Sequence, residues 1–262
     1  MMQTKLIAFA NNKGGSGKST TAANVGYSLA EMGKKVLMID CDMQLNLTLA
    51  FFPEEEVIQM ARGEENLYSA VKNGKDISEI ICKTPYENID FVPSSTLLSG
   101  IEFELFTKWQ REFVLRNLLK KTVESGVYDY IILDAPPTLG GWTMNILIAA
   151  DALVLPVEAS PWGLFGLANM LDFVQQVKTV SPDIDLLGVV VTKVDTRKNY
   201  FKQTLAALKE QPDCKAFETY IRLDANVEWA EDACKPVGAF KKTSRSAEEY
   251  RNLTKEIVER CQ

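Results

Sequence analysis

Short apolar runs alternate with amphipathic stretches along much of the chain. The apolar runs have the length of buried strands, and they cover residues 5–10, 35–40, 128–134, 152–157, 186–192 and 216–221. Apolar residues recur at helical spacing over residues 18–32, 111–124, 163–180, 198–210 and 246–260. Strands that alternate with helices are typical of a parallel sheet covered on both faces. We therefore predict an α/β fold: a single domain over residues 1–262, with a mostly parallel, twisted sheet and helices on both faces.

Acidic side chains stand where two of the predicted strands end. Asp40 and Asp134 close their apolar runs, and Asp42 follows two residues after Asp40. A glycine-rich segment, residues 11–18, comes directly after the first run. Ligands of parallel sheets bind beyond the carboxyl ends of the strands. We expect these acids and the glycine-rich segment to converge on one site.

The glycine-rich segment has the features of a phosphate-binding loop. Residues 11–20 read Asn-Asn-Lys-Gly-Gly-Ser-Gly-Lys-Ser-Thr. The glycines allow backbone conformations that turn amide groups toward phosphate oxygens, and the helix that begins near Lys18 adds the positive end of its dipole. Lys18 suits the β- and γ-phosphates, and the Ser19 hydroxyl suits Mg²⁺. The order of strand, loop, Lys-Ser and helix predicts a nucleoside-triphosphate site.

The loop contains a second lysine, Lys13, and Asn12 stands where the general pattern GxxxxGK[ST] has its first glycine. One phosphate cradle hardly needs two lysines from the same chain. A lysine at the start of the loop could instead reach a nucleotide held by a partner subunit, as an arginine finger does in trans. This interpretation predicts that the chain works as a dimer with itself.

Composition narrows the chemistry. Hydrophobic residues make up 46% of the chain and charged residues 24%, which is ordinary for a globular protein. The five cysteines are odd in number and none forms a CxxC pair, so a disulfide framework, a zinc site and an iron–sulfur site are disfavoured, and we expect free thiols in a reducing cytoplasm. The chain has no histidine, which removes histidine acid–base chemistry. We see no signal peptide and no run apolar enough to span a bilayer.

Four blocks of the chain resemble the ParA/MinD family of P-loop ATPases. Residues 13–20 are similar to its deviant Walker A motif, residues 40–46 (Asp-Cys-Asp-Met-Gln-Leu-Asn) to its DxDPQGN segment, and residues 132–137 (Ile-Leu-Asp-Ala-Pro-Pro) to its Walker B motif with DxPP. Gly188–Thr192 with Asp195 and Arg197 resembles the later strand and the nucleotide-base region. Met43 and Leu45 replace the usual proline and glycine. The chain looks most like the short ParA proteins of plasmid and chromosome partition.

The resemblance implies a P-loop NTPase fold, a Mg²⁺-dependent ATPase activity and a role for each matched residue. Lys13 would reach across an ATP-sandwich dimer, Lys18 would hold the β- and γ-phosphates, and Asp42 would orient the attacking water, so these three act in catalysis. The residues implied to bind ATP are Lys13, Gly14, Gly15, Ser16, Gly17, Lys18, Ser19, Thr20 (near the α-phosphate) and Thr192. The residues implied to hold Mg²⁺ are Ser19, Asp40 (through water) and Asp134 (behind the direct ligands).

For the biological role we weigh first a DNA-partition ATPase. Its ATP dimer would bind DNA without sequence preference, and a centromere-binding partner protein would stimulate an otherwise slow hydrolysis, in the cytoplasm on the nucleoid. The net charge is −6, yet residues 190–262 hold more Lys and Arg than Asp and Glu, so a DNA-binding face would lie there. The candidate DNA contacts are Lys241, Lys242 and Arg245, with Arg222, Lys198 and Lys202 possible; solvated surface charge is the alternative interpretation.

Two other roles stay open at this point. A MinD-like positioning ATPase acting on a membrane or a protein scaffold would need a basic amphipathic C-terminal helix, and residues 254–262 offer Ile257 and Val258 beside two glutamates. A tyrosine kinase of the same loop family would carry a tyrosine-rich tail, whereas Tyr250 stands alone. We expect no membrane partner.

Overall fold

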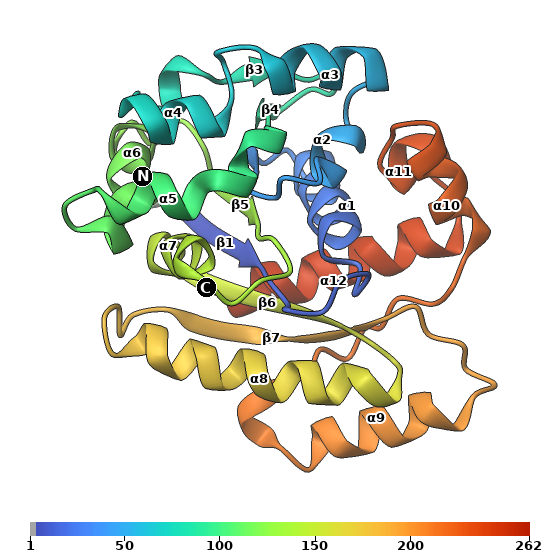
Figure 1. Cartoon of the computed structure of the whole chain (residues 1–262). Coiled ribbons are helices and arrows are strands. Elements are labelled where there is room, and N and C mark those ends of the chain that lie inside the picture. The colour runs from blue at the N-terminus through green and yellow to red at the C-terminus, as the bar shows by residue number, and fades with distance from the viewer. Residues whose placement is uncertain (1–3) are drawn as a thin grey trace.

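The strands form one seven-stranded sheet in the order β3-β4-β2-β5-β1-β6-β7 (Figure 1). The computed structural model describes residues 4–262, except the side chains of Pro161, Trp162, Lys209 and Pro212. The strand bounds are Lys5–Phe9 (β1), Val36–Asp40 (β2), Cys82–Lys83 (β3), Ile89–Val92 (β4), Tyr130–Asp134 (β5), Ala152–Glu158 (β6) and Asp185–Thr192 (β7). Each pair is parallel except β3 with β4. The predicted single domain with a mostly parallel sheet is confirmed.

Helices cover both faces of this sheet (Figure 1). Alternate residues of β1 show the division: Leu6 and Ala8 belong to one hydrophobic cluster, and Ile7 and Phe9 to the other. The first cluster takes residues from α4 (Leu67–Asn73), α5 (Ile101–Phe106), α6 (Val114–Glu124), α7 (Gly141–Ala149), α8 (Pro161–Lys178) and α9 (Asn199–Lys209). The second takes residues from α1 (Lys18–Glu31), α2 (Asn46–Leu49), α3 (Glu54–Arg62), α10 (Ala225–Asp232), α11 (Val237–Phe240) and α12 (Arg245–Arg260).

The register places the predicted acids side by side. Asp40, the last residue of β2, pairs with Asp134, the last residue of β5, and Asp134 pairs in turn with Phe9 at the end of β1. The loop at residues 11–17 follows β1, so it leaves the same edge of the sheet. The expectation that the acids and the glycine-rich loop meet at one edge is confirmed.

The predicted strand at 216–221 is wrong. Phe217 and Ile221 donate backbone hydrogen bonds to β7, to the carbonyls of Val189 and Val191, both at 2.9 Å. The amides of Glu218 and Thr219 donate instead to the Glu256 carboxylate of α12, both at 2.9 Å. Because a side chain takes the donors that a ladder needs, the segment lies along β7 without becoming a strand.

Residues 50–110 hold elements that the sequence pattern did not predict. Helices α3, α4 and α5 and the strands β3 and β4 lie there, together with short 3₁₀ turns at 77–79 and 96–100. Each is nine residues or shorter, which is too short for a clear period in the sequence. A further 3₁₀ turn, at 111–113, precedes α6 and takes the start of the helix predicted at 111–124, and another lies at 212–214. No helix in the described part of the chain is long and apolar enough to cross a membrane.

Candidate active site

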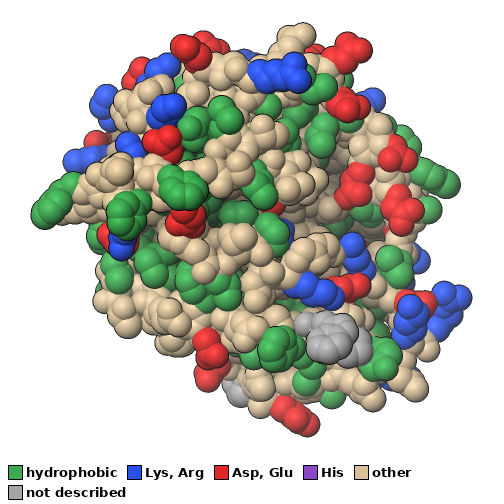
Figure 2. Space-filling view, viewed as in Figure 1, with side chains coloured by type: hydrophobic (Ala, Val, Ile, Leu, Met, Phe, Trp, Pro, Cys, Tyr) green, Lys and Arg blue, Asp and Glu red, His purple; other side chains and the backbone are tan. Residues whose placement is uncertain are grey.

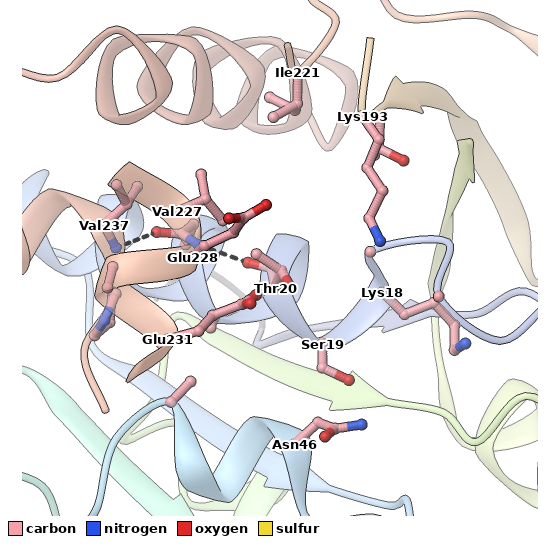
Figure 3. A pocket seen from close by; sticks show the side chains of 18 of the residues that line it. Lys18, Ser19, Thr20, Asn46, Lys193, Ile221, Val227, Glu228, Glu231 and Val237 are labelled. Atoms are coloured by element: carbon pink, nitrogen blue, oxygen red, sulfur yellow. Dashed lines mark hydrogen bonds between the residues drawn. The ribbon is translucent and has the colours of Figure 1, made fainter. Parts of the chain in front are cut away.

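A cavity of about 660 Å³ opens beyond the carboxyl ends of the central strands. The loop before α1 forms one side, and α10 and α11 form the opposite side (Figure 3). Lys18, Ser19 and Thr20 lie at the start of α1, and Thr20 points toward Glu228 and Glu231 of α10. A volume of this size suits a ligand as large as a nucleotide.

The backbone of the loop is shaped as an anion cradle. Gly15 and Gly17 have φ angles of 74° and 80°, in the left-handed region that favours glycine. A Cβ on Gly17 would lie 3.6 Å from Thr192 Oγ1, which itself donates to the Ser16 carbonyl at 2.8 Å. No side chain caps the N-terminus of α1, so its first amide groups stay open to a ligand. Gly14, Gly15, Gly17 and Thr192 line the cavity.

Lys18 points into the cavity from a buried position, with 6% of its surface exposed. Its Nζ is 3.4 Å from the Lys13 carbonyl. Burial lowers the pKa of Lys18, while the nearby charges of Asp134 and Asp42 raise it. An ammonium between two carboxylates and an open helix N-terminus is placed to neutralise phosphate charge.

Lys13 turns the other way, although only five residues separate it from Lys18. It is absent from the cavity lining, and its Nζ donates to the Glu158 carboxylate and to the Ser160 hydroxyl, the latter at 3.0 Å. The hydrogen bond from Lys13 lowers the pKa of Glu158. In the single chain the second lysine of the loop is therefore held against β6, outside its own nucleotide cavity.

Asp40 is fully buried, and its carboxylate is built into the loop that follows β2. One oxygen accepts from the Asp42 amide at 3.0 Å. The other accepts from the Thr48 amide at 2.9 Å and the Thr48 hydroxyl at 2.6 Å. Burial raises the pKa of Asp40 to about 7, against these hydrogen bonds. The predicted contact with a magnesium-bound water would have to share an oxygen that already accepts from the protein.

Asp134 is equally buried, but its carboxylate has no hydrogen-bond partner among the described groups. Neither carboxylate oxygen meets hydrogen-bond geometry with a described group, although Ser19 and Lys18 lie close enough to lower its pKa. Burial is the largest influence and raises the pKa of Asp134 well above its usual range, and the Asp40 charge adds to the rise. A buried carboxylate without a hydrogen-bond partner costs free energy. Asp134 is therefore a candidate to bind a ligand of the protein.

Asp42 lines the cavity and is held by its own loop. Its Oδ1 accepts from the Gln44 amide at 3.0 Å, and its carbonyl accepts from the Ser94 hydroxyl at 2.7 Å. Burial raises the pKa of Asp42, while the Gln44 amide and the Lys18 charge lower it. The carboxylate thus stands beside the lysine that faces the cavity, where it could accept a hydrogen bond from a water molecule.

The donor set at the site fits Mg²⁺. The open Asp134 oxygens and the Ser19 hydroxyl are hard oxygen ligands at the edge of the cradle, which Mg²⁺ prefers. Among residues 4–262 no group of three or more His, Cys, Asp or Glu side chains could hold a metal. A magnesium ion held mostly by phosphates and water needs no such cluster. The Ser16 hydroxyl is also buried without a partner in the described structure.

The comparisons with known proteins show the family to which the chain belongs. Residues 4–186 match the protein family described as AAA domain. The sporulation initiation inhibitor protein Soj of Bacillus subtilis is 37% identical over 255 residues, which are 97% of this chain and 98% of Soj. The chromosome partitioning protein ParA of Caulobacter vibrioides is 30% identical over 257 residues, which are 98% of this chain and 94% of that protein. The chain belongs to the ParA/MinD family of P-loop ATPases.

The fold of this ParA/MinD-family ATPase recurs in solved structures. Cobyrinic acid a,c-diamide synthase of Mycobacterium smegmatis, solved with a bound ATP analogue and magnesium, superposes with a TM-score of 0.83 at 26% identity. The match covers 96% of this chain and 93% of that one. The fold therefore agrees with that of a P-loop NTPase.

One wall of the cavity in this ParA/MinD-family chain had no assigned role. Residues of α10, α11 and the segment before them line it: Ile221, Leu223, Val227, Glu228, Glu231, Pro236 and Val237. Thr20 donates to Glu231 at 2.6 Å, and the Val237 amide donates to Asn24 of α1 at 2.7 Å (Figure 3). The resemblance implies that Thr20 lies near the α-phosphate. In the structure its hydroxyl is hydrogen-bonded to this wall of the cavity. These wall residues carry no phosphate-loop motif, so the sequence pattern did not assign them to the site.

The candidate DNA contacts of this ParA/MinD-family chain lie around the α11–α12 junction. They differ in how far their side chains are already engaged by other groups of the chain. Arg245 donates to the Leu223 carbonyl at 2.6 Å and lies 3.7 Å from Glu249. Lys242 lies 3.8 Å from Glu31. Lys241 is exposed and pairs with no carboxylate among the described residues. Arg222 pairs with Glu249, while Lys198 and Lys202 are exposed near the start of α9, apart from this group.

Proposed function

We propose that this chain is a DNA-partition ATPase that works as an ATP-dependent dimer with itself. It uses ATP and Mg²⁺. The observation that carries the proposal is the division between the two loop lysines: Lys18 enters the cavity of its own subunit, whereas Lys13 is turned away from it. A lysine outside its own cavity but at the rim of the loop can serve a nucleotide held by a second subunit.

The residues of one subunit prepare the phosphates for transfer. The amides of the glycine-rich loop and the Lys18 ammonium hold the β- and γ-phosphates, and Ser19 and Asp134 hold the magnesium side. Mg²⁺ supplies neutralisation of the charge that develops on the phosphate oxygens. Asp42, which lines the cavity, orients the attacking water. Phosphoryl transfer depends mainly on positioning and charge, so no histidine is required.

Lys13 explains why the isolated subunit should be slow. To reach the partner's nucleotide it must exchange Glu158 and Ser160 for phosphate oxygens. The exchange replaces one charged partner with another, so its cost is small once the second subunit is in place. Turnover should therefore depend on dimer formation, which gives a stimulating partner protein a step to act on.

An exposed apolar group supports a protein partner. Phe103 and Phe106 of α5 and Trp109 after it are 83%, 76% and 91% exposed, and hydrophobic side chains gather over this helix in Figure 2. Large apolar side chains that gather, exposed, on one part of the surface are typical of interaction sites. We assign them to a protein contact, with a centromere-binding protein as the expected partner of a partition ATPase.

DNA is the proposed surface for the dimer, in the cytoplasm on the nucleoid. Lys241, Lys242 and Arg245 are the proposed phosphate contacts, with Lys241 the most available. Doubling a small basic group by dimerisation doubles the phosphates it can neutralise, which makes binding depend on ATP and on salt. This would reconcile local DNA binding with a net charge of −6.

A membrane-positioning role is disfavoured by α12. Its apolar residues Tyr250, Leu253 and Ile257 are buried in the cluster beneath α1, and Val258 packs against the same cluster. An anchor helix must bury its apolar face in lipid, whereas this face already stabilises the core. The described C-terminal helix is therefore not available as a membrane anchor.

The dimer is tested by sedimentation with ATP and with ADP. The wild-type chain should sediment as a dimer with ATP alone. Lys13→Ala should keep nucleotide binding and lose both the dimer and hydrolysis, and Lys18→Ala should lose nucleotide binding itself. An unchanged ATP dimer in the Lys13→Ala variant would refute the cross-subunit role.

DNA binding is tested with random-sequence duplex at several salt concentrations. Binding should require ATP and weaken steeply as salt rises, and Lys241→Ala should reduce the salt slope by about 1 per subunit. Lys35→Ala, which removes an exposed lysine just before β2, is the matched control. Binding that is the same with ATP and ADP at low salt would exclude the partition role.

A further inference from the structure

The loop that carries Asp42 is tied to α7 by a single buried side chain. Trp142, the second residue of α7, is 2% exposed, and its indole Nε1–H donates to the Cys41 carbonyl at 2.9 Å. Cys41 lies between Asp40 and Asp42. Trp142 is not part of the cavity lining, so it does not contact the nucleotide site directly.

This hydrogen bond completes the anchoring of one peptide group. The Cys41–Asp42 peptide has its carbonyl held by Trp142, and its N–H donates to Asp40 Oδ1 at 3.0 Å. The groups on either side are also held: the Cys41 amide donates to the Asp134 carbonyl at 3.0 Å, and the Asp42 carbonyl accepts from Ser94 at 2.7 Å. When both polar groups of a peptide are fixed, its plane is fixed. The hydrogen bond from Ser94 to the Asp42 carbonyl then restrains rotation of the Asp42 backbone, so the direction in which the Asp42 side chain leaves the backbone is fixed as well.

Trp142 is itself held by α5. The Trp142 amide donates to Glu102 Oε1 at 3.0 Å, so the Glu102 carboxylate caps the N-terminus of α7. Gly140 and Gly141 make this approach possible, because a Cβ on either would lie 2.5 or 2.8 Å from a Glu102 oxygen. Two hydrogen bonds therefore run from α5 through Trp142 to the Asp42 loop.

We propose that Trp142 is a positioning residue for ATP hydrolysis, which fixes the Cys41–Asp42 peptide and thereby aims Asp42, and that Glu102 holds Trp142 in place. The proposal rests on the role proposed above for Asp42. Its distinctive feature is that the indole N–H matters, and not only the bulk of the ring, because the N–H alone reaches the Cys41 carbonyl.

The test compares side chains that differ in this one donor. Replacing Trp142 with 3-benzothienylalanine keeps the ring size and removes the N–H, whereas 5-fluorotryptophan keeps the N–H. Trp142→Phe is the genetic counterpart, and Trp229→Phe is the control at an exposed tryptophan outside the cavity lining. Basal hydrolysis by the full chain is measured with MgATP and without DNA or partner protein, alongside the dissociation constant for ATP.

We expect kcat to fall about tenfold with benzothienylalanine and with Trp142→Phe, which corresponds to about 1.4 kcal/mol of transition-state stabilisation. ATP affinity should stay within about twofold in each, since Trp142 lies outside the cavity. The 5-fluorotryptophan chain and Trp229→Phe should keep the wild-type kcat. A benzothienylalanine chain with the wild-type kcat, or with kcat and ATP affinity reduced together, overturns the proposal.

A second pair of variants tests the link to α5. Glu102→Ala removes the cap of α7 and should lower kcat in the same direction, with ATP affinity retained. Glu104→Gln is the control on the same helix, because the Glu104 carboxylate accepts from Tyr68 instead of α7. An unchanged kcat in Glu102→Ala removes Glu102 from the proposal.

Asp42→Ala separates the two levels of the argument. If Asp42→Ala hydrolyses ATP normally, the role of Asp42 itself is wrong, and Trp142 has nothing to aim. If Asp42→Ala is inactive while the benzothienylalanine chain is fully active, only the positioning role of Trp142 fails. The absence of DNA from the assay keeps both outcomes independent of the partition role.

Discussion

Asp40 and Asp134 are the same residue type at the ends of adjacent strands, paired in register and fully buried, yet the structure treats them differently. Asp40 accepts hydrogen bonds from Asp42 and Thr48, whereas Asp134 has no hydrogen-bond partner among the described groups. Burial raises the pKa of both. The difference indicates a division of work: Asp40 organises the loop that carries Asp42, and Asp134 is kept open for the magnesium side of the nucleotide.

The largest expected effect separates the two acids by activity. Asp134→Asn should lower hydrolysis of MgATP at least about 100-fold, because an ionised carboxylate on the magnesium side is lost from a site that works by preorganised charge. Phosphate release at saturating MgATP measures the loss. Asp183→Asn, at an exposed position before β7, is the matched control. Wild-type turnover in Asp134→Asn would show that its open oxygens serve no catalytic purpose.

In the absence of nucleotide and Mg²⁺, the raised pKa values of Asp40 and Asp134 should make the stability of the chain depend on pH. The pKa of Asp40 is raised from 3.8 to about 7, so the folded chain keeps a proton that the unfolded chain has released. Stability should therefore fall as pH rises, by about 2 to 3 kcal/mol between pH 5 and 7 from Asp40 alone. Asp134 acts in the same direction, since its pKa is also raised. Urea unfolding across this range measures the slope, and a free energy of unfolding that increases toward pH 7 would contradict it.

The asparagine variants of the two acids should change stability in opposite directions at pH 7. At pH 7 the folded chain must either keep a proton on Asp134 or bury its charge without a partner, so Asp134→Asn removes this cost and the free energy of unfolding should rise by about 1 to 2 kcal/mol. Asp40→Asn turns an acceptor of three hydrogen bonds into a group with a donor, so it should fall by about 1 to 2 kcal/mol. Equal shifts in the two variants, measured by urea unfolding, would remove the contrast between the acids.

The smallest expected effect concerns Thr48. Thr48→Val keeps the shape of the side chain and removes the hydroxyl that donates to Asp40 at 2.6 Å. We expect a loss of about 1 kcal/mol in the free energy of unfolding and a further rise in the pKa of Asp40, because this hydroxyl lowers it. Thr196→Val, at an exposed position, is the control. If the pH at which stability falls is not higher in Thr48→Val than in the wild-type chain, the hydroxyl is not the group that lowers the pKa of Asp40.

Much of the site could be predicted because its chemistry is contiguous. Residues 11–20 carry the glycines, both lysines and the hydroxyl in one segment, and the acids close their strands at positions set by a period of two. The parallel arrangement then brings strand ends to one edge. The roles assigned to individual residues of this site stay predictions until the variants are measured.

Other parts of the site depend on contacts between distant segments. Trp142 meets Cys41 across 101 residues, and Val237 meets Asn24 across 213. No local spacing encodes such contacts, because they arise only when elements pack. The wrong strand at 216–221 has the same origin: its pattern was suited to a strand, but Glu256 of α12 takes two of the amides.

The sequence by itself determined the class of fold, the phosphate loop and the family, since these depend on short-range order: apolar runs, glycines and a lysine followed by a serine. The tertiary structure alone decided where the side chains of that loop and of the strand ends point. Lys13 turns from the cavity because Glu158, 145 residues away, offers it a charged partner. Asp40 is closed and Asp134 open because only the first has a hydroxyl and two amides folded back onto it. Hydrogen bonds and charge pairs of this kind exist only after the chain has packed, so residue identity alone does not fix them.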